Sequence, residues 1–322
     1  MRKLTFAAVA VASLTLSACS TVSPAADAGE IADGFPVTVK HSAGETEIAN
    51  KPSSIVVFDM AALDTLDALG VGERVVGVPV TSVPTWLKDD DGIDYSELAN
   101  VGTLKEPDLE AVAKLNPDLV ILGSRSASFY EEFSAAFTTL DASVSWENGD
   151  YSAEVTDSIR MLGEATGEAD RAGELAAKIE EETASYMGTA EGLGTAMVLM
   201  TSGGEVSMHS PKSRWAPIFD VFGFKPVSEG AAEEGHKGQK ISFETVRELN
   251  PDYIFVVDRD AAVGQTEAGK TAQQVLDNEL VAETNAAKSG NIHYLSSERW
   301  YIVMTGASNY LEELGEIADA IQ

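Results

Sequence analysis

Two arginines stand at matching places in two copies of one sequence pattern. The first copy reads PDLEAVAKLNPDLVILGSR and ends at Arg125, and the second reads ISFETVRELNPDYIFVVDR and ends at Arg259. A guanidinium group is always charged and donates in a fixed fork, so it suits negatively charged oxygens. The chemistry that this spacing predicts is the capture of one anionic ligand by arginines from two related units.

Each copy also predicts the elements that would bring its arginine to a ligand. A helix at 109–115 or 243–249 stops before Asn-Pro, because the residue before proline is pushed out of the α region. An apolar run follows at 119–122 or 253–257, as in a strand buried on both faces. Ligands of open parallel sheets bind beyond the carboxyl ends of the strands, where both arginines stand. We therefore predict two similar α/β lobes with a cleft between them, although duplication of a fold element explains the Asn-Pro-Asp part equally well.

The N-terminus predicts export and a lipid anchor. Residues 1–18 have a basic start and an apolar stretch too short to cross a bilayer, as in a secretory signal peptide. The sequence LSAC that ends at Cys19 resembles the lipobox of bacterial lipoproteins, which implies cleavage before Cys19 and a lipid on its thiol. Residues 19–34 are small and polar and read as a flexible tether. We expect a protein on the extracytoplasmic face of the cell membrane, or in the periplasm.

The composition excludes several partners. The 322 residues carry a formal net charge of −30, which argues against nucleic acid and against attraction to anionic lipid. Cys19 is the only cysteine, so an intrachain disulfide is ruled out. We also expect a monomer. Because arginines are few, any that converge on one spot are informative.

The chain is long enough for two domains with separate cores. We predict an N-terminal α/β lobe at 35–166, a single long linking helix at 167–192 and a C-terminal α/β lobe at 193–322. A linking helix of about 19 residues would extend roughly 28 Å. Further predicted elements are a hairpin that turns at 42–44 and helices at 128–140, 271–280 and 309–321.

One motif imitates a nucleotide site. Residues 264–271, GQTEAGKT, satisfy the P-loop pattern GxxxxGK[ST] between a predicted strand and a predicted helix. The carboxylates of Asp258, Asp260 and Glu267 surround this loop with negative charge, and an exported protein meets little nucleotide. We therefore predict a glycine loop and a helix start here, and no phosphate site.

Together these features resemble the helical-backbone substrate-binding lipoproteins of ABC importers. The likeness is strongest over 213–301, in the segments SRWAPIFDVFGFKPV, NPDYIFVVDRDAAVG, AQQVLDNELV and IHYLSSERWY. These segments look like the branch that binds ferric catecholate siderophores of the petrobactin and enterobactin type. The resemblance implies two Rossmann-like lobes joined by a single long helix. It also implies a ferric siderophore as transported ligand, an ABC permease and its ATPase as partners, no catalysis and no intrinsic cofactor.

The resemblance also implies roles for individual residues. In that branch arginines hold the anionic chelate, and Arg125, Arg214 and Arg259 match them. A histidine and a tyrosine can complete the coordination of iron, which points to His236 and Tyr301. Imidazole and phenolate are reasonable donors to a ferric ion.

Three further positions complete the predicted sites. Trp215 joins the ligand-binding set. Glu110 and Glu244 occupy matching places early in the two repeated helices, where members of the family dock on arginines of the permease. The helix dipole alone would also favour a carboxylate in a first turn. His236 departs from the family pattern, because one residue separates it from the glycine that usually follows directly.

Other ligands, and one other class of protein, stay open. The same fold could hold haem, cobalamin or a bare metal ion, but a transition metal would need several histidines together, and those present are widely dispersed: His41, His209, His236 and His293. A surface hydrolase is the other alternative, although the sequence has no GxSxG elbow and no HExxH pair. The sequence does not decide between catecholate and hydroxamate siderophores, or between the two kinds of bacterial envelope.

Overall fold

The structure is a computed structural model that describes residues 34–88, 92–146, 149–228, 238–265 and 270–322. All of them belong to one compact unit, Ala32–Gln322. The predicted lipidation site Cys19 and the predicted iron ligand His236 lie outside the described residues. Within the described ranges, no helix is both long enough and apolar enough to span a membrane.

The first sheet has five strands, all parallel, in the order β5-β4-β3-β6-β7. They span β3 Ile55–Val57, β4 Val75–Val78, β5 Ala99–Asn100, β6 Leu119–Leu122 and β7 Thr139–Asp141. Every residue of β3 and β6 is buried, which explains their unbroken apolar sequences. The helices of this part are α1 Met60–Ala68, α2 Leu109–Leu115 and α3 Tyr130–Ser134.

A hairpin of β1 (Val37–His41) and β2 (Gly44–Ile48) covers the β7 edge of this sheet, and its turn confirms the prediction. The Ser42 amide donates to the Asp141 carbonyl at 3.1 Å, and the Thr46 hydroxyl donates to the Thr139 carbonyl at 2.8 Å. These bonds satisfy edge carbonyls that another chain could otherwise pair with.

The predicted helix at 128–140 is wrong in extent. The chain forms a 3₁₀ helix at Ser124–Phe129, the short helix α3 and then strand β7. β7 pairs with β6 and is buried throughout, so strand pairing outweighs the helical propensity of the preceding alanines. The β-branched Thr138 and Thr139 also favour the extended chain.

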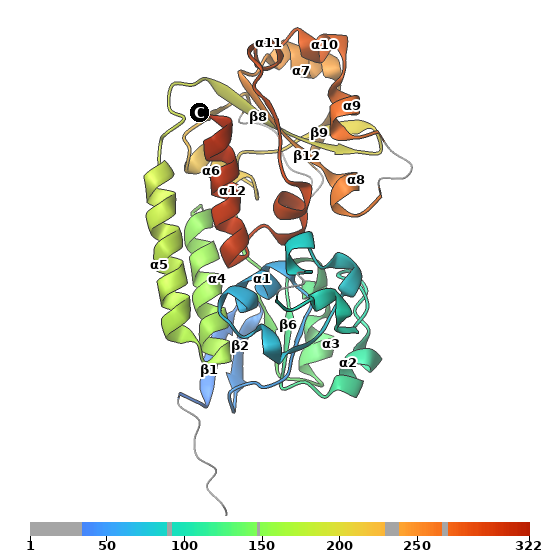
Figure 1. Cartoon of the computed structure of the whole chain (residues 1–322), viewed down its shortest axis with the longest axis vertical. Coiled ribbons are helices and arrows are strands. Elements are labelled where there is room, and N and C mark those ends of the chain that lie inside the picture. Colours follow the sequence, from blue (N-terminus) through green and yellow to red (C-terminus); the bar gives the residue numbers. More distant parts are fainter. Residues whose placement is uncertain (1–33, 89–91, 147–148, 229–237, 266–269) are drawn as a thin grey trace, which may run out of the picture. The chain divides into compact units, whose positions relative to one another are not determined.

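The second sheet mixes strand directions in the order β11-β9-β8-β12-β13, and β10 pairs with β8 off this path. Its strands β8, β9 and β12 are labelled in Figure 1. The strands span β8 Thr195–Ser202, β9 Glu205–Met208, β10 Lys225–Pro226, β11 Gln239–Ile241, β12 Tyr253–Asp258 and β13 Ile292–Tyr294. β9 runs antiparallel to β8 because the chain turns at Gly203 and Gly204, whose φ angles of +59° and +79° suit glycine. β11, which we did not predict, extends the sheet beyond β9.

The two sequence repeats fold alike, as predicted. α2 and α7 (Phe243–Leu249) both end at an asparagine, Asn116 or Asn250, with φ of 45°. Asparagine ends a helix in this left-handed conformation at little steric cost. β6 and β12 follow, so Arg125 and Arg259 stand just beyond the carboxyl ends of two equivalent strands.

The aspartates of the two Asn-Pro-Asp motifs hold neighbouring strands in place. Asp118 accepts the amides of Ser53 and Ser54 at 2.8 and 3.0 Å, directly before β3. Asp252 accepts the amide of Thr195 at 2.9 Å, where β8 begins. The Ser53 hydroxyl bond in one lobe and the Thr195 amide bond in the other are the main reasons that both aspartates have a lowered pKa.

Helices α4 (Tyr151–Thr166) and α5 (Ala169–Tyr186) pack on each other and are joined at Gly167. Helix α5 has 18 residues and falls within the predicted linking segment 167–192. The last helix, α12 (Ala307–Ala320), follows the second sheet in sequence but packs against α1, α4 and α5 (Figure 1).

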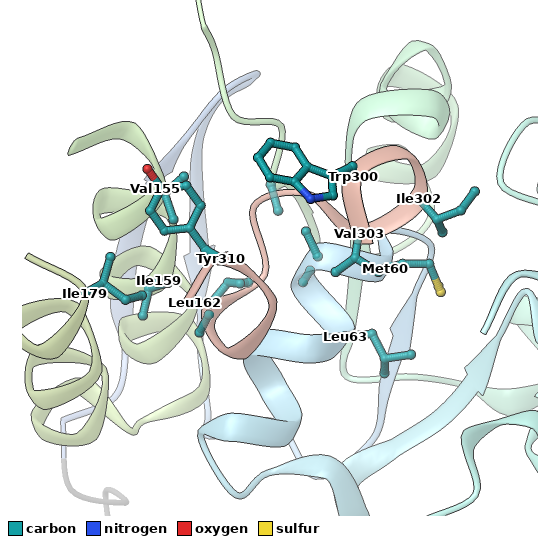
Figure 2. Packing of buried hydrophobic residues seen from close by; sticks show 14 of the residues in the cluster. Met60, Leu63, Val155, Ile159, Leu162, Ile179, Trp300, Ile302, Val303 and Tyr310 are labelled. Carbon is teal, nitrogen blue, oxygen red and sulfur yellow. The ribbon is translucent and has the colours of Figure 1, made fainter. Parts of the chain in front are cut away.

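Both apolar packing and a buried carboxylate hold α12 there. Figure 2 shows Tyr310 of α12 in the cluster that contains Val155 and Ile159 of α4, and all three are fully buried. Asp64 of α1 accepts the amides of Ser308 and Asn309 at 2.9 and 3.1 Å, in the first turn of α12. A carboxylate at this place is favoured by the helix dipole. The start of α12 is therefore fixed by a residue of the first lobe.

The predicted helix at 271–280 is divided into α9 (Ala272–Leu276) and α10 (Glu279–Ala282). The Asn278 side chain accepts an amide at the start of α10, which breaks the run. Thr271, the last residue of the P-loop-like motif, caps α9 together with Gln274. The two remaining short helices are α6 Ala216–Asp220 and α11 Asn285–Ser289.

Candidate anion-binding site

Arg125 reaches from the first lobe to the backbone of a π-helix, Arg299–Val303, that we did not predict. Its Nη2 donates to the carbonyl of Tyr301, and its Nη1 lies 3.5 Å from the carbonyl of Ile302. Its guanidinium carbon lies 5.2 Å from the centre of the Tyr301 ring. π-helical turns occur often at functional sites, and this one presents a tyrosine to an arginine of the other lobe.

Arg259 approaches the same tyrosine from the second lobe. It is the first residue of α8 (Arg259–Ala262), and its Nε donates to the Tyr301 hydroxyl at 3.1 Å. Its Nη1 lies 3.3 Å from the Ser202 hydroxyl and 3.4 Å from a carboxylate oxygen of Asp260. These two neighbours fix the orientation of the guanidinium group.

Arg214 is the third arginine at Tyr301, 5.4 Å from the ring centre. Only 7% of Arg214 is exposed, and its Nη1 lies 3.7 Å from the sulfur of Met304. Trp215 is fully buried, with its ring 5.5 Å from the Arg214 guanidinium and stacked on Trp300 at 5.7 Å. Trp215 therefore contacts Arg214 from inside the protein, and its predicted contact with a ligand stays a prediction.

Three positive charges act on one phenol at this site. Burial alone raises the pKa of Tyr301, but the hydrogen bond from Arg259 and the charges of Arg259, Arg125 and Arg214 outweigh it. The net effect lowers the pKa of Tyr301 below its ordinary value. The arrangement therefore favours the phenolate, a negatively charged oxygen that can bind a hard cation.

A cavity of about 410 Å³ lies at this site and is lined by segments of both lobes. Its charged and phenolic lining residues are Lys88, Lys105, Arg125, Arg259, Glu298 and Tyr301. The sequence analysis missed the two lysines. Lys105 lies in the loop after the short strand β5, which we did not predict, and Lys88 follows β4 only after two 3₁₀ helices, so no strand-end signal marked either lysine.

The π-helix is held in place from both sides. The Asn309 side chain donates to the carbonyls of Arg299 and Met304, at 3.4 and 2.9 Å. On the first lobe, the Thr85 hydroxyl donates to Glu298 at 2.7 Å, and the Trp86 ring lies 4.3 Å from the Arg299 guanidinium. Tyr301 is thus positioned by the distant stretch of Thr85 and Trp86 and by Asn309 of the next helix.

The comparison with known families decides what kind of protein carries this site. Residues 55–298 match the family described as periplasmic binding protein. The chain belongs to the periplasmic binding protein family. Its two α/β lobes and the helix between them agree with the fold that the sequence predicted.

Full-length relatives of this periplasmic binding protein are named for iron chelates. The petrobactin-binding protein YclQ of Bacillus subtilis is 35% identical over 97% of this chain and 96% of its own length. The ferric-anguibactin-binding protein FatB of Vibrio anguillarum is 30% identical over 89% of this chain and 88% of its own.

Solved structures agree with these relatives. The crystal structure of YclQ superposes with a TM-score of 0.80 over 89% of this chain and 98% of that chain. The catecholate-siderophore binding protein VctP of Vibrio cholerae superposes with a TM-score of 0.76 at 30% identity, over 87% of this chain and 99% of that chain.

The remaining predicted positions are placed as follows. Glu110 and Glu244 are both exposed, in the first turns of α2 and α7.

Among the residues that the structure describes, no group of three His, Cys, Asp or Glu could hold a metal ion. Of the histidines within these ranges, His41 contacts Thr46 and Tyr130, and His209 packs on Trp215. A bare metal ion therefore finds no cluster of ligands in the described part of the chain.

Proposed function

We propose that this periplasmic binding protein captures a ferric siderophore, with a catecholate favoured, and delivers it to an ABC permease. The names of the full-length relatives support an iron chelate as the ligand class. Haem, cobalamin and a hydroxamate chelate are the competing ligands. Binding proteins of this family carry substrates and do not transform them, so we propose no catalysis and no resident cofactor.

The observation that carries the proposal is the convergence of three guanidinium groups on Tyr301. Their carbons lie 5.2, 5.4 and 5.9 Å from the ring centre, in a chain whose formal net charge is −30. A body of that charge repels an anionic chelate unless cations are gathered locally. Arg125, Arg214 and Arg259 supply those cations, and their forked geometry suits the oxygens of a ferric catecholate.

We propose Tyr301 as a ligand that completes the coordination of iron where the siderophore leaves positions open. The lowered pKa of its phenol supports this role, because less free energy is needed to form the phenolate at neutral pH. His236 remains the proposed nitrogen ligand.

Three further proposals concern the setting of the protein. Lipid on Cys19 would hold it at the extracytoplasmic face of the membrane. Glu110 and Glu244 would dock on the permease, whose ATPase drives import, and their equivalent exposed positions on the two lobes support this pairing. We propose a monomer.

Ligand titration followed by tryptophan fluorescence tests the ligand class. Ferric petrobactin should quench the fluorescence with a submicromolar Kd, while ferrioxamine B, haemin and cobalamin should bind at least about a hundredfold more weakly. If ferrioxamine B, haemin or cobalamin binds more tightly than ferric petrobactin, that compound's class replaces the ferric catecholate as the proposed ligand. No binding of any ferric chelate would overturn it.

A further inference from the structure

A second, smaller cavity lies next to the arginine site. Its volume is about 180 Å³. The lining residues that matter here, which define the Tyr151 chamber, are Asp59, Ser124, Trp146, Tyr151, Met304 and Thr305. Nothing in the sequence analysis pointed to it.

The hydroxyl groups of two mostly buried residues, Tyr151 and Thr305, belong to the lining of this chamber and have no hydrogen-bond partner in the described part of the chain. Tyr151 is 5% exposed and Thr305 is 9% exposed. The hydrogen bonds among the described residues include none to either hydroxyl, although Tyr151 packs against Tyr310. Neither oxygen is among the fully buried atoms without a partner in the described residues, so both hydroxyls are accessible from the cavity and can pair with a polar group of a ligand.

Asp59 adds an acceptor to the same chamber. It is 9% exposed, and it caps α1 by accepting the amides of Ala61 and Ala62 at 2.9 and 3.1 Å. Both bonds end on Oδ1, so Oδ2 can accept from an N–H or O–H group of a ligand. Burial raises the pKa of Asp59, although the amides of Ala61 and Ala62 and the charge of Arg125 oppose this shift, so an uncharged hydrogen-bonding group suits this position.

Backbone strain points to the same place. In the described part of the chain, four residues other than glycine have positive φ. Asn116 and Asn250 end helices, whereas Ser124 and Met304, with φ of 48° and 56°, both line the Tyr151 chamber. Strain of this kind persists where the surrounding structure enforces it, and it gathers at ligand sites.

The chamber and the arginine cavity share two segments of chain. Ser124 lines the chamber, and the next residue, Arg125, lines the arginine cavity. In the same way Val303 lines the chamber, and Ile302 lines the arginine cavity. A ligand whose iron lies at Tyr301 therefore has the chamber within reach of its organic arms.

We propose that the Tyr151 chamber binds an uncharged, hydrogen-bonding arm of the siderophore, such as an amide or alcohol group. The arm donates to Asp59 Oδ2 and pairs with the hydroxyls of Tyr151 and Thr305, beside the indole of Trp146. The arginine site recognises the anionic iron centre, while the chamber distinguishes one siderophore backbone from another. This inference rests on the proposed function.

Two conservative variants test the subsite. Tyr151→Phe and Thr305→Val remove one hydroxyl each and keep the shape of the side chain. Each should weaken binding of ferric petrobactin, which has amide-bearing arms, by about five- to tenfold. Neither should change the affinity for the ferric complex of plain catechol, which offers catecholate-bound iron without any arms.

Thr183→Val and Tyr95→Phe are the matched controls. Thr183 is 8% exposed and its hydroxyl has no partner among the described residues, but it lies on α5 outside the chamber. Tyr95 donates to Asp67 at 2.6 Å, also outside the chamber. Both controls should leave both affinities unchanged.

The outcomes separate the two proposals. If the wild type binds both ferric complexes and the chamber variants bind petrobactin as tightly as it does, the chamber holds only water and the subsite is wrong. Equal losses for both complexes would also overturn it, because they would indicate a general disturbance of the site. If the wild type binds neither complex, the proposed function fails, and the subsite fails with it.

Discussion

At Tyr301, burial and charge act on the same phenol in opposite directions. Burial disfavours the phenolate, and three arginines favour it, with the nearest polar contact from Arg259 Nε at 3.1 Å. The arginines prevail, so the pKa of Tyr301 is lowered. One aspect of this site follows from sequence: the repeat singles out Arg125 and Arg259. The position of Tyr301 between these two arginines does not follow from the repeat. Tyr301 lies 42 residues after Arg259, and no local pattern reveals that the two side chains meet.

Arg259→Lys tests the guanidinium geometry at the residue scale. Lysine keeps the charge but loses the fork that contacts both Tyr301 and Ser202. We expect the affinity for ferric petrobactin to fall about tenfold or more, and the pKa of Tyr301 to rise toward its ordinary value of about 10. Binding titrations measure the first effect, and tyrosinate absorbance, with Tyr301→Phe as reference, measures the second. Arg247→Lys, on an exposed part of α7, is the control, and an equal loss in that variant would contradict the account.

At the scale of elements, the π-helix Arg299–Val303 is the part that sequence reasoning could not supply. Its start is fixed by a contact from far along the chain, Thr85 with Glu298, and its carbonyls are held by the side chain of Asn309 in the following helix. By contrast, α2 and α7 were predictable to the residue, because the Asn-Pro signal that ends them is local. Local signals thus fix the elements that carry the arginines, and tertiary contacts fix the one that carries the tyrosine.

Asn309→Ala should loosen the π-helix. The Met304 carbonyl loses its side-chain donor, while the Arg299 carbonyl keeps only the N–H of Met304 at 2.7 Å, so we expect the free energy of unfolding to fall by about 1–3 kcal/mol and the siderophore affinity to fall as well. Urea denaturation and ligand titration measure the two effects. Asn278→Ala, which removes the cap of α10, should lower stability without changing affinity. Unchanged affinity in Asn309→Ala would show that this contact does not position Tyr301.

The Asn-Pro-Asp aspartates predict a loss of stability in acid. Both Asp118 and Asp252 have a pKa below the value of about 3.9 expected in the unfolded chain. Their contribution is therefore complete above that value and is lost as the pH falls through the folded-state pKa. Asp252→Asn should destabilise the protein at pH 7, and the difference from the wild type should shrink as the pH falls from 4 to 2. A difference that stays constant with pH would contradict this explanation.

At the scale of the whole molecule, the predicted two lobes and linking helix match the structure, but the position of α12 does not follow from sequence order. Asp64 and Thr65 of α1 accept amides at its start, so the last helix completes the packing around α4 and α5. Nothing local marks Asp64 for this role, since its partners lie at the far end of the chain. Sequence order therefore assigns a helix to the correct lobe only when that helix packs against elements that are near it in the sequence.

The overall charge of −30 gives a further prediction. Long-range repulsion should slow the approach of an anionic ferric complex, and salt screens it over a Debye length of about 10 Å at 0.1 M. We expect the association rate constant of ferric petrobactin, from stopped-flow fluorescence, to rise between 10 and 150 mM salt. If the association rate constant falls as salt is added, the attraction of the arginine site outweighs the repulsion by the negative net charge even at long range.

The position of iron in a crystal of the complex tests the central claim most directly. Anomalous diffraction at the iron edge, from crystals grown with ferric petrobactin, should give one strong peak within bonding distance of Tyr301 Oη, among the guanidinium groups of Arg125, Arg214 and Arg259. A peak elsewhere, with these arginines still engaged only with protein atoms, would contradict the account.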